Sequence, residues 1–197
     1  MDELSTCVYI LKICPDYETK RHQFKAEINV LSNLNSIHVP SLITCFEEDF
    51  AQCFVETYIP GINARQYFQN HRCLFKKYRL LIDVLKVLQD LHQIGYLYID
   101  LKLENISNPT IPIRKDFINS IHIDYQNHFY LIDFNACIEN HSHVAVMASK
   151  SNCAPELLTL NEKDIRCDIY ALGSLIQELF GISMMPIVLL CHQKQER

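Results

Sequence analysis

The pattern of apolar residues predicts strands and one helix in the first third of the chain. Residues 7–13 are rich in β-branched and aromatic side chains, which is typical of a strand. Apolar side chains then recur at helical spacing over residues 20–34. Two further runs, 41–47 and 52–59, read as strands, and Pro60-Gly61 predicts a turn after them.

Helical periodicity dominates the rest of the chain. A helix of at least three turns is predicted over residues 80–91, and Gly95 is placed to end it. Its apolar face comprises Leu80, Leu81, Val84, Leu85, Leu88 and Leu91. Residues 121–132 predict two short strands around a polar turn, and 168–180 predict a last helix. This order of elements predicts an α+β fold, in which a small β-rich part packs against an α-rich part.

Composition narrows the class of protein. Of 197 residues, 49% are hydrophobic and 21% are charged, which is a globular balance. The net charge of −5 offers no basic surface, so a nucleic-acid partner is not expected. Residues 170–191 are strongly apolar, but Gln177 and Glu178 near their centre are costly in a bilayer, so we expect a buried helix and no membrane span.

Cysteine usage indicates a reducing compartment. The nine cysteines are an odd number without a Cys-x-x-Cys pair, and the acidic start lacks the basic residues of a signal peptide. We therefore expect free thiols in a cytoplasmic protein. One cysteine–histidine cluster fits no common zinc spacing and is not expected to bind metal. It comprises Cys137, His141, His143 and Cys153.

Reactive side chains gather just after the long predicted helix. Asp100, Lys102 and Asn105 lie within six residues of one another. An aspartate can orient or deprotonate a hydroxyl, a lysine can neutralise a transferring phosphoryl group, and an asparagine can hold a magnesium ion. Each residue type alone is commonly a solvated surface residue. Asp100 and Asp133, however, both end apolar runs, where solvated acids are less expected.

Several motifs in order make the chain resemble the eukaryotic-type serine/threonine protein kinase family. Asp100-x-Lys102-x-x-Asn105 is similar to the family's catalytic loop, and Asp133-Phe134-Asn135 is similar to its magnesium motif. Ala154-Pro155-Glu156 matches the end of the activation segment, and the stretch that opens at Asp168 looks like the start of the following buried helix. Bacterial members look most similar around Gly95 to Lys102. The resemblance covers nearly the whole chain.

The resemblance implies a role in phosphoryl transfer for four of these residues. Asp100 would accept or orient the proton of the substrate hydroxyl, and Lys102 would stabilise charge on the γ-phosphoryl group. Asn105 and Asp133 would coordinate Mg²⁺.

Four further residues take binding or structural roles by the same resemblance. The strand that carries Lys12 fits the family's phosphate-binding lysine strand, and Lys12 would hold the α- and β-phosphates of ATP. Glu27 is its expected partner on the first helix, with Glu18 as the alternative. Asp168 would brace the catalytic loop through backbone contacts, and Glu156 would have a structural role.

The chain departs from the family pattern in several places. None of the eleven residues before Lys12 is glycine, so the loop that covers the phosphates is expected to be reduced. Tyr98 and Ile99 replace the histidine and arginine before the aspartate, which removes the usual receptor for an activation-segment phosphate. Asn135 replaces a glycine and is expected to tolerate positive φ. Residues 106–120 are additional and are expected to form an exposed loop.

The resemblance implies a kinase-like two-lobe fold that is truncated at both ends. A reduced β-rich N-lobe is expected over residues 1–59 and an incomplete α-rich C-lobe over 60–197. The last helix would then have fewer partners, so we expect an exposed apolar face on it and possible completion by a partner chain. This face comprises Leu172, Leu175, Ile176 and Leu179.

Three functions are compatible with these features. The first is transfer of the γ-phosphoryl group of ATP to a protein serine or threonine, with Mg²⁺ as cofactor. The second is a pseudokinase or scaffold, or a non-functional fragment, that binds a partner without turnover. The third is a small-molecule kinase, but Lys102 and the Ala-Pro-Glu motif argue against it.

Overall fold

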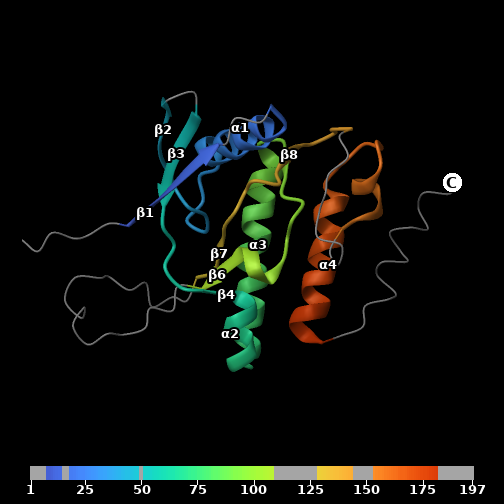
Figure 1. Ribbon diagram of the computed structural model, residues 1–197. Helices are drawn as coiled ribbons and strands as arrows, with labels where there is room; N and C mark the ends of the chain where they lie inside the picture. The colour runs from blue at the N-terminus through green and yellow to red at the C-terminus, as the bar shows by residue number, and fades with distance from the viewer. Residues whose placement is uncertain (1–7, 15–17, 49–50, 109–127, 144–152, 182–197) are drawn as a thin grey trace, which may run out of the picture.

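The computed structural model describes residues 8–14, 18–48, 51–108, 128–143 and 153–181, and it confirms the α+β fold (Figure 1). A small antiparallel sheet and one helix form one end of the molecule. The remaining helices and short strands form the other end. The long helix α3 (Leu74–Gln93) runs through the middle of the view.

The sheet has three strands, as the sequence predicts. β1 (Tyr9–Cys14), β2 (Leu42–Glu48) and β3 (Ala51–Thr57) pair antiparallel in the order β1-β3-β2, so β3 is central. The register places Lys12 opposite Phe54. Because side chains alternate along a strand, Glu56 lies on the same face of β3 as Phe54 and therefore on the face that carries Lys12.

Helix α1 (Glu18–Asn33) confirms the helix predicted from the first periodic stretch. Phe24, Val30 and Leu31 are buried, and the Phe24 ring lies 5.0 Å from that of Phe54, centroid to centroid. This packing fixes α1 against the sheet. It also turns Glu27, which is only 2% exposed, toward the interior.

A short helix after the turn was not predicted. β4 (Ile62–Asn63) leads into α2 (Ala64–Asn70), and the Asn63 side chain accepts a hydrogen bond from the Gln66 N–H at 2.9 Å. This is an N-cap. The capping asparagine was the available sequence signal, but seven residues are too few for a clear helical period.

Helix α3 begins six residues before its predicted apolar face and ends as expected. Gly95 has φ of +82° just beyond Gln93, which is the conformation that glycine adopts most easily at a helix end. Leu85 was wrongly assigned to the core, since it is 47% exposed. On a helix of 100° per residue it lies about 140° from Leu80, whereas the buried apolar positions lie within an arc of about 100°. The buried apolar residues are Leu80, Val84, Val87, Leu88 and Leu91.

Short strands complete the helical part. β5 (Tyr96–Leu97) pairs with β8 (Ile138–Glu139), and β6 (Ile106–Asn108) lies between β4 and β7 (Tyr130–Leu131). The first strand of the predicted 121–132 hairpin lies outside the described residues. In the described part, the strand that pairs with β7 is β6, with Ile106 opposite Leu131.

The expectation of an exposed loop over 106–120 is therefore wrong at its start. Ile106 is fully buried, and residues 106–108 form β6. Ile106 is an apolar residue directly after Asn105 and is typical of a strand. Because two prolines follow further on, the start of the loop was predicted at residue 106, whereas the strand continues to Asn108. Residues 109–120 lie outside the described residues.

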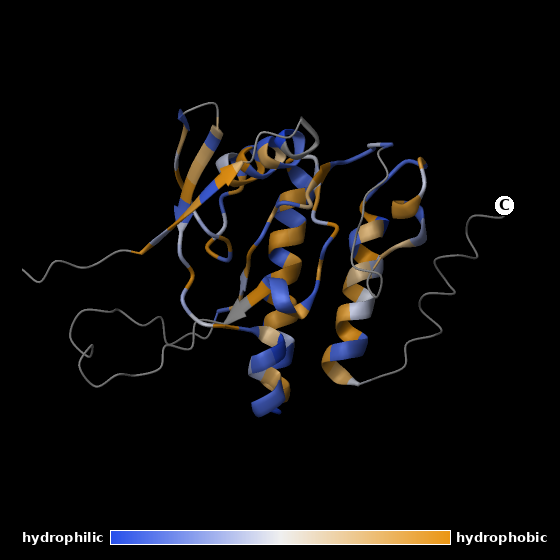
Figure 2. Cartoon of the chain, in the orientation of Figure 1, coloured by the Kyte–Doolittle hydropathy of each residue, from blue (hydrophilic) through white to orange (hydrophobic). Residues whose placement is uncertain are grey.

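The last helix, α4 (Arg166–Phe180), is confirmed, but the exposed apolar face expected on it is wrong. Leu172, Leu175 and Leu179 are buried, and Ile176 is partly buried against the same core. That core contains residues of α1, α3 and α4, and Figure 2 shows apolar positions along both α3 and α4. This face is therefore covered by the chain's own helices and does not require a partner chain to bury it.

The part of the chain that the structure describes contains no membrane-spanning helix, and it does not bring Cys137, His141, His143 and Cys153 together as a metal site. No helix there has both the length and the apolar character needed to cross a bilayer. Cys137 is buried in the core, while His141 forms an ion pair with Glu162. The seven cysteines within the described ranges are all free thiols.

Candidate active site

Lys12 lies between two buried carboxylates. Its Nζ is 2.5 Å from Glu27 Oε1 and 3.3 Å from Glu56 Oε1. The lysine side chain is 26% exposed, whereas both glutamate side chains are almost fully buried. The predicted pairing with Glu27 is thus present in the geometry. Glu56 was missed, although an acid inside the apolar β3 run was a usable signal.

Burial and charge act against each other in this group. Burial lowers the pKa of Lys12, but the charges of Glu27 and Glu56 outweigh it, so the pKa is raised. Burial also raises the pKa of Glu27 and of Glu56, although the Lys12 charge lowers both. The group holds two acids for one base, and it is therefore an electrostatically unbalanced site that favours a further cation nearby.

Asp100, Lys102 and Asn105 of the 98–105 loop contact one another directly. Lys102 Nζ donates to Asp100 Oδ2 at 2.5 Å. The amide Nδ2 of Asn105 donates to the Asp100 backbone oxygen at 3.0 Å and lies 3.2 Å from Asp100 Oδ2. The carboxylate of Asp100 is therefore held by a cation on one side and by an amide on the other.

Ile99, just before Asp100, has a strained backbone that Asp168 holds in place. Its φ is +72°, which is rare and costly for a β-branched residue. Asp168, fully buried in α4, accepts hydrogen bonds from the Tyr98 N–H at 2.9 Å and the Ile99 N–H at 2.8 Å. His92 Nε2 lies 2.8 Å from the same carboxylate. These bonds are the ones that a bracing residue needs.

Tyr98 joins this loop to the segment that carries Asp133. Its hydroxyl donates to the Ile132 backbone oxygen at 2.5 Å, and its ring meets the Phe134 ring edge to face at 5.4 Å. Burial raises the pKa of Tyr98 well above its ordinary value, so the hydroxyl keeps the proton that it donates. The Ile132 N–H also donates to the Asn105 backbone oxygen at 2.9 Å.

Asp133 therefore lies next to the other polar residues. Its negative charge raises the pKa of both Lys12 and Glu27. Together with the charge of Asp100, it also raises the pKa of Tyr98. Asp133 itself has φ of +66°. Asn135 was expected to accommodate positive φ, but it has none, because the left-handed residue of this turn is Asp133.

The donor set fits a hard divalent cation. Asn105 turns its NH₂ group toward Asp100, so its amide oxygen is the ligand atom that it would offer. Asp133 would add a carboxylate from the adjoining segment. Amide and carboxylate oxygens are suitable ligands for Mg²⁺, which commonly binds through one or two carboxylates together with substrate phosphates.

Glu156 lies away from this group, at the short helical turn η3 (Pro155–Leu158). Its Oε1 accepts a weak hydrogen bond from the Cys167 thiol at 3.6 Å, which ties η3 to the start of α4. Burial, together with the Glu156 charge, raises the pKa of Cys167 to about 12. The contact is thus structural, between two segments of the helical part.

Comparison with known families identifies the class of protein. The protein kinase domain family matches the chain over residues 2–187, so this chain belongs to that family. The match covers both the sheet that carries Lys12 and the segments that carry Asp100 and Asp133.

Individual relatives are distant in sequence. The citron rho-interacting kinase of Rattus norvegicus is 24% identical over 189 residues, which are 87% of this chain and 8% of that protein. The serine/threonine-protein kinase Sgk1 of Homo sapiens is 26% identical over 170 residues, or 83% of this chain and 36% of that protein. Protein kinase PVPK-1 of Phaseolus vulgaris is 33% identical over 90 residues, covering 42% of this chain and 14% of that protein. The chain thus spans a minor part of each relative's length.

Proposed function

We propose that this chain transfers the γ-phosphoryl group of ATP to a serine or threonine hydroxyl of a protein substrate. The observation that carries the proposal is the meeting of the Lys12–Glu27 pair with Asp133 and the Asp100–Lys102–Asn105 group. Asn105 and Asp133 would hold Mg²⁺, which would neutralise the negative charge that develops during transfer. The family assignment and the naming of relatives such as Sgk1 as serine/threonine kinases support the choice of substrate.

Each side chain has a defined task in this proposal. Lys12 binds α- and β-phosphate oxygens, and Glu27 keeps its ammonium aimed at them. Asn105 and Asp133 supply oxygen ligands to Mg²⁺. The bonds from Asp168 to the N–H groups of Tyr98 and Ile99 hold the start of the loop in its strained form.

Asp100 and Lys102 act at the transferring group. Asp100 orients the substrate hydroxyl and accepts its proton through a carboxylate oxygen. Lys102 contacts Asp100 at 2.5 Å, and in this proposal it moves to the γ-phosphoryl oxygens once ATP binds. Its ammonium then balances the negative charge that the transferred group carries.

The proposed setting is the cytoplasm, with protein substrates. The free thiols at the described cysteine positions agree with a reducing compartment. We propose that the chain divides into residues 1–59, which carry Lys12 and Glu27, and residues 60–197, which carry the loop residues. The substrate site would lie where these parts meet.

A second candidate is a module that binds nucleotide or a partner without turnover. Glu56 favours it, because this buried carboxylate lies 3.3 Å from Lys12 and competes with phosphate for the same ammonium. A kinase in which the lysine is held by two acids would bind ATP more weakly than one with a single acid.

A phosphoryl-transfer assay separates the two candidates. The purified chain is incubated with γ-labelled ATP, Mg²⁺ and a mixed library of serine, threonine and tyrosine peptides. We expect label on serine or threonine, and we expect Asp100→Asn to lower the rate by about 10²–10⁴-fold. Glu104→Gln is a matched control in the same loop, because Glu104 pairs with Arg65 at the surface. Absence of transfer by the folded wild type would support the second candidate.

A further inference from the structure

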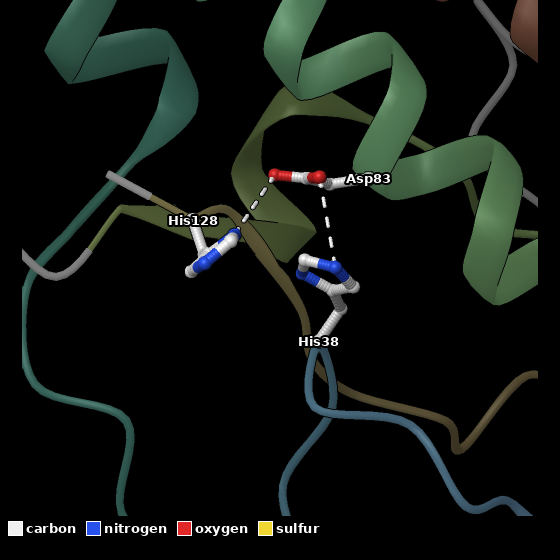
Figure 3. A group of neighbouring side chains, drawn as sticks. All are labelled: His38, Asp83 and His128. Atoms are coloured by element: carbon white, nitrogen blue, oxygen red, sulfur yellow. Dashed lines mark ion pairs between the residues drawn. The ribbon is translucent and has the colours of Figure 1, made fainter. Parts of the chain in front are cut away.

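A second buried polar cluster lies outside the site described above (Figure 3). It combines His38 from the segment after α1, Asp83 from α3, and His128 from the segment before β7. Their side chains are 4%, 0% and 8% exposed. One potential ligand atom from each residue lies within 4.8 Å of the other two. Among the residues that the structure describes, no other group of this kind comes together.

Asp83 is the centre of the cluster. Its Oδ1 lies 3.6 Å from His38 Nε2, and its Oδ2 lies 3.9 Å from His128 Nδ1. Its Oδ2 also accepts the Phe129 N–H at 3.2 Å. The carboxylate is thus oriented by the backbone and presents an oxygen to each imidazole, as the dashed lines in Figure 3 show.

The hydrogen bond of His38 on its other side determines which nitrogen faces Asp83. His38 Nδ1 lies 3.1 Å from the Phe129 backbone oxygen. A carbonyl oxygen only accepts, so Nδ1 carries the hydrogen, and a neutral ring then has its lone pair on Nε2. A lone pair and a carboxylate oxygen therefore face each other across 3.6 Å, in buried surroundings, beyond the length of a hydrogen bond. A cation between the two atoms would stabilise this arrangement.

We propose that His38, Asp83 and His128 bind a divalent transition-metal ion, for which Zn²⁺ is the best fit. Zinc bonds of about 2.0–2.2 Å at tetrahedral angles place neighbouring ligand atoms about 3.4 Å apart. The separations of 3.6 and 3.9 Å are close to this value. The bond from His38 to the Phe129 carbonyl is also the kind that orients a metal-binding histidine from behind. Two imidazoles and one carboxylate form a zinc ligand set with a fourth position left for water.

Arg79 occupies the place of the cation in the structure described. Its Nη2 donates to His128 Nδ1 at 2.7 Å, and its Nε lies 3.2 Å from Asp83 Oδ1. The Arg79 side chain is 31% exposed, so it can swing into solvent without burying its charge elsewhere. Metal binding must therefore displace this guanidinium, and Arg79 sets the affinity by competition.

Such an ion would fasten the sheet end to the helical end. His38 follows α1, and its backbone oxygen accepts the Leu131 N–H at 2.8 Å. Asp83 belongs to the long central helix. A bound ion would thus link three segments that are far apart in sequence, and it would stabilise the folded chain in proportion to its concentration.

The test is a metal titration of the full chain after treatment with a chelator. Co²⁺ absorption reports a tetrahedral nitrogen and oxygen site, and the lack of a sulfur charge-transfer band separates it from binding by cysteines. Zn²⁺ should then compete for the same site and raise the melting temperature. Arg79→Met should bind at least about tenfold more tightly, because the ion no longer displaces a charge-assisted hydrogen bond. Asp133→Ala should leave the titration unchanged, which excludes the candidate active site.

His38→Gln should abolish the absorption band, provided that its melt shows a folded protein. If that variant does not fold, the Co²⁺ affinities of the wild type and Arg79→Met together test the proposal. Failure of both to bind Co²⁺ would overturn the proposal, as would equal affinities of the two. Binding that persists in folded His38→Gln would also overturn it.

Discussion

Lys12, Glu27 and Glu56 form a group with two buried acids and one base. The register of β1 and β3 puts Glu56 on the face of the sheet that carries Lys12, and the packing of α1 adds Glu27. The pairing of Lys12 with Glu27 could be predicted from the sequence, because Glu27 lies where the kinase family places the helical partner of its lysine. The sequence marks Glu56 as an acid within an apolar strand, but its contact with Lys12 depends on the register of β1 and β3, which only the fold gives.

Replacing Lys12 with methionine should abolish nucleotide binding and lower stability. The change leaves two buried carboxylates without their cation, and we expect a loss of about 1–3 kcal/mol, since Lys12 is itself partly exposed. Isothermal titration with Mg·ATP and urea unfolding measure the two effects. Lys25→Met on the exposed face of α1 is the matched control and should change neither. Retained binding in Lys12→Met would exclude Lys12 from the phosphate site.

The contribution of Glu56 to stability should fall as pH rises above about 4.5. Its pKa is raised from 4.5 by burial, so the folded state holds this proton at pH values where the unfolded state has lost it. Stability from this group therefore decreases as pH rises through that window. Glu56→Gln carries no such proton and should gain stability relative to wild type between pH 4 and neutral pH, as urea melts at several pH values would measure. A constant difference across this range would contradict the prediction.

Helix α4 supports the 98–105 loop through one buried acid, Asp168. The positive φ of Ile99 is tolerated because Asp168 accepts the N–H groups of both Tyr98 and Ile99. The backbone strain is therefore at Ile99 in the loop, while the carboxylate that stabilises it belongs to α4.

Asp168→Asn should destabilise the fold and lower activity together. An amide keeps one acceptor oxygen for two backbone donors, so we expect a loss of about 1–3 kcal/mol. Urea unfolding and the phosphoryl-transfer rate measure these effects. Glu162→Gln, which removes only a surface pairing with His141, should change stability by less than about 1 kcal/mol. If Asp168→Asn were as stable as the wild type, the hydrogen bonds from Asp168 would not be needed to keep the loop in its conformation.

Long periodic elements were predictable from the sequence, and short ones were not. The first three strands and helices α1, α3 and α4 show their period over enough residues to be read. Helix α2 and strand β6 are too short to do so, and β6 is defined by its pairing with β4 and β7. The exposed face expected on α4 was wrong for a related reason: burial depends on which helices lie opposite, and the shared core with α1 and α3 is a property of the fold.

In the molecule as a whole, Lys12 and its two glutamates at the sheet end lie near Asp133, which belongs to the helical end together with Asp100 and Asn105. Sequence motifs predicted which residues would take part in this site. They did not predict that Tyr98 would tie the loop to Ile132 and Phe134, because a tyrosine replaces the residue usual at that position. The central claim is that this arrangement holds Mg·ATP between the two ends.

Magnesium-dependent protection by ATP in a thermal melt tests that claim most directly. At about one hundred times the dissociation constant, binding should contribute about 2.7 kcal/mol and raise the melting temperature by about 5 °C or more. The shift should require both ATP and Mg²⁺, and it should vanish in Asp133→Ala while that variant still melts cooperatively. A wild-type melt that does not move with ATP and Mg²⁺ would contradict the proposed site.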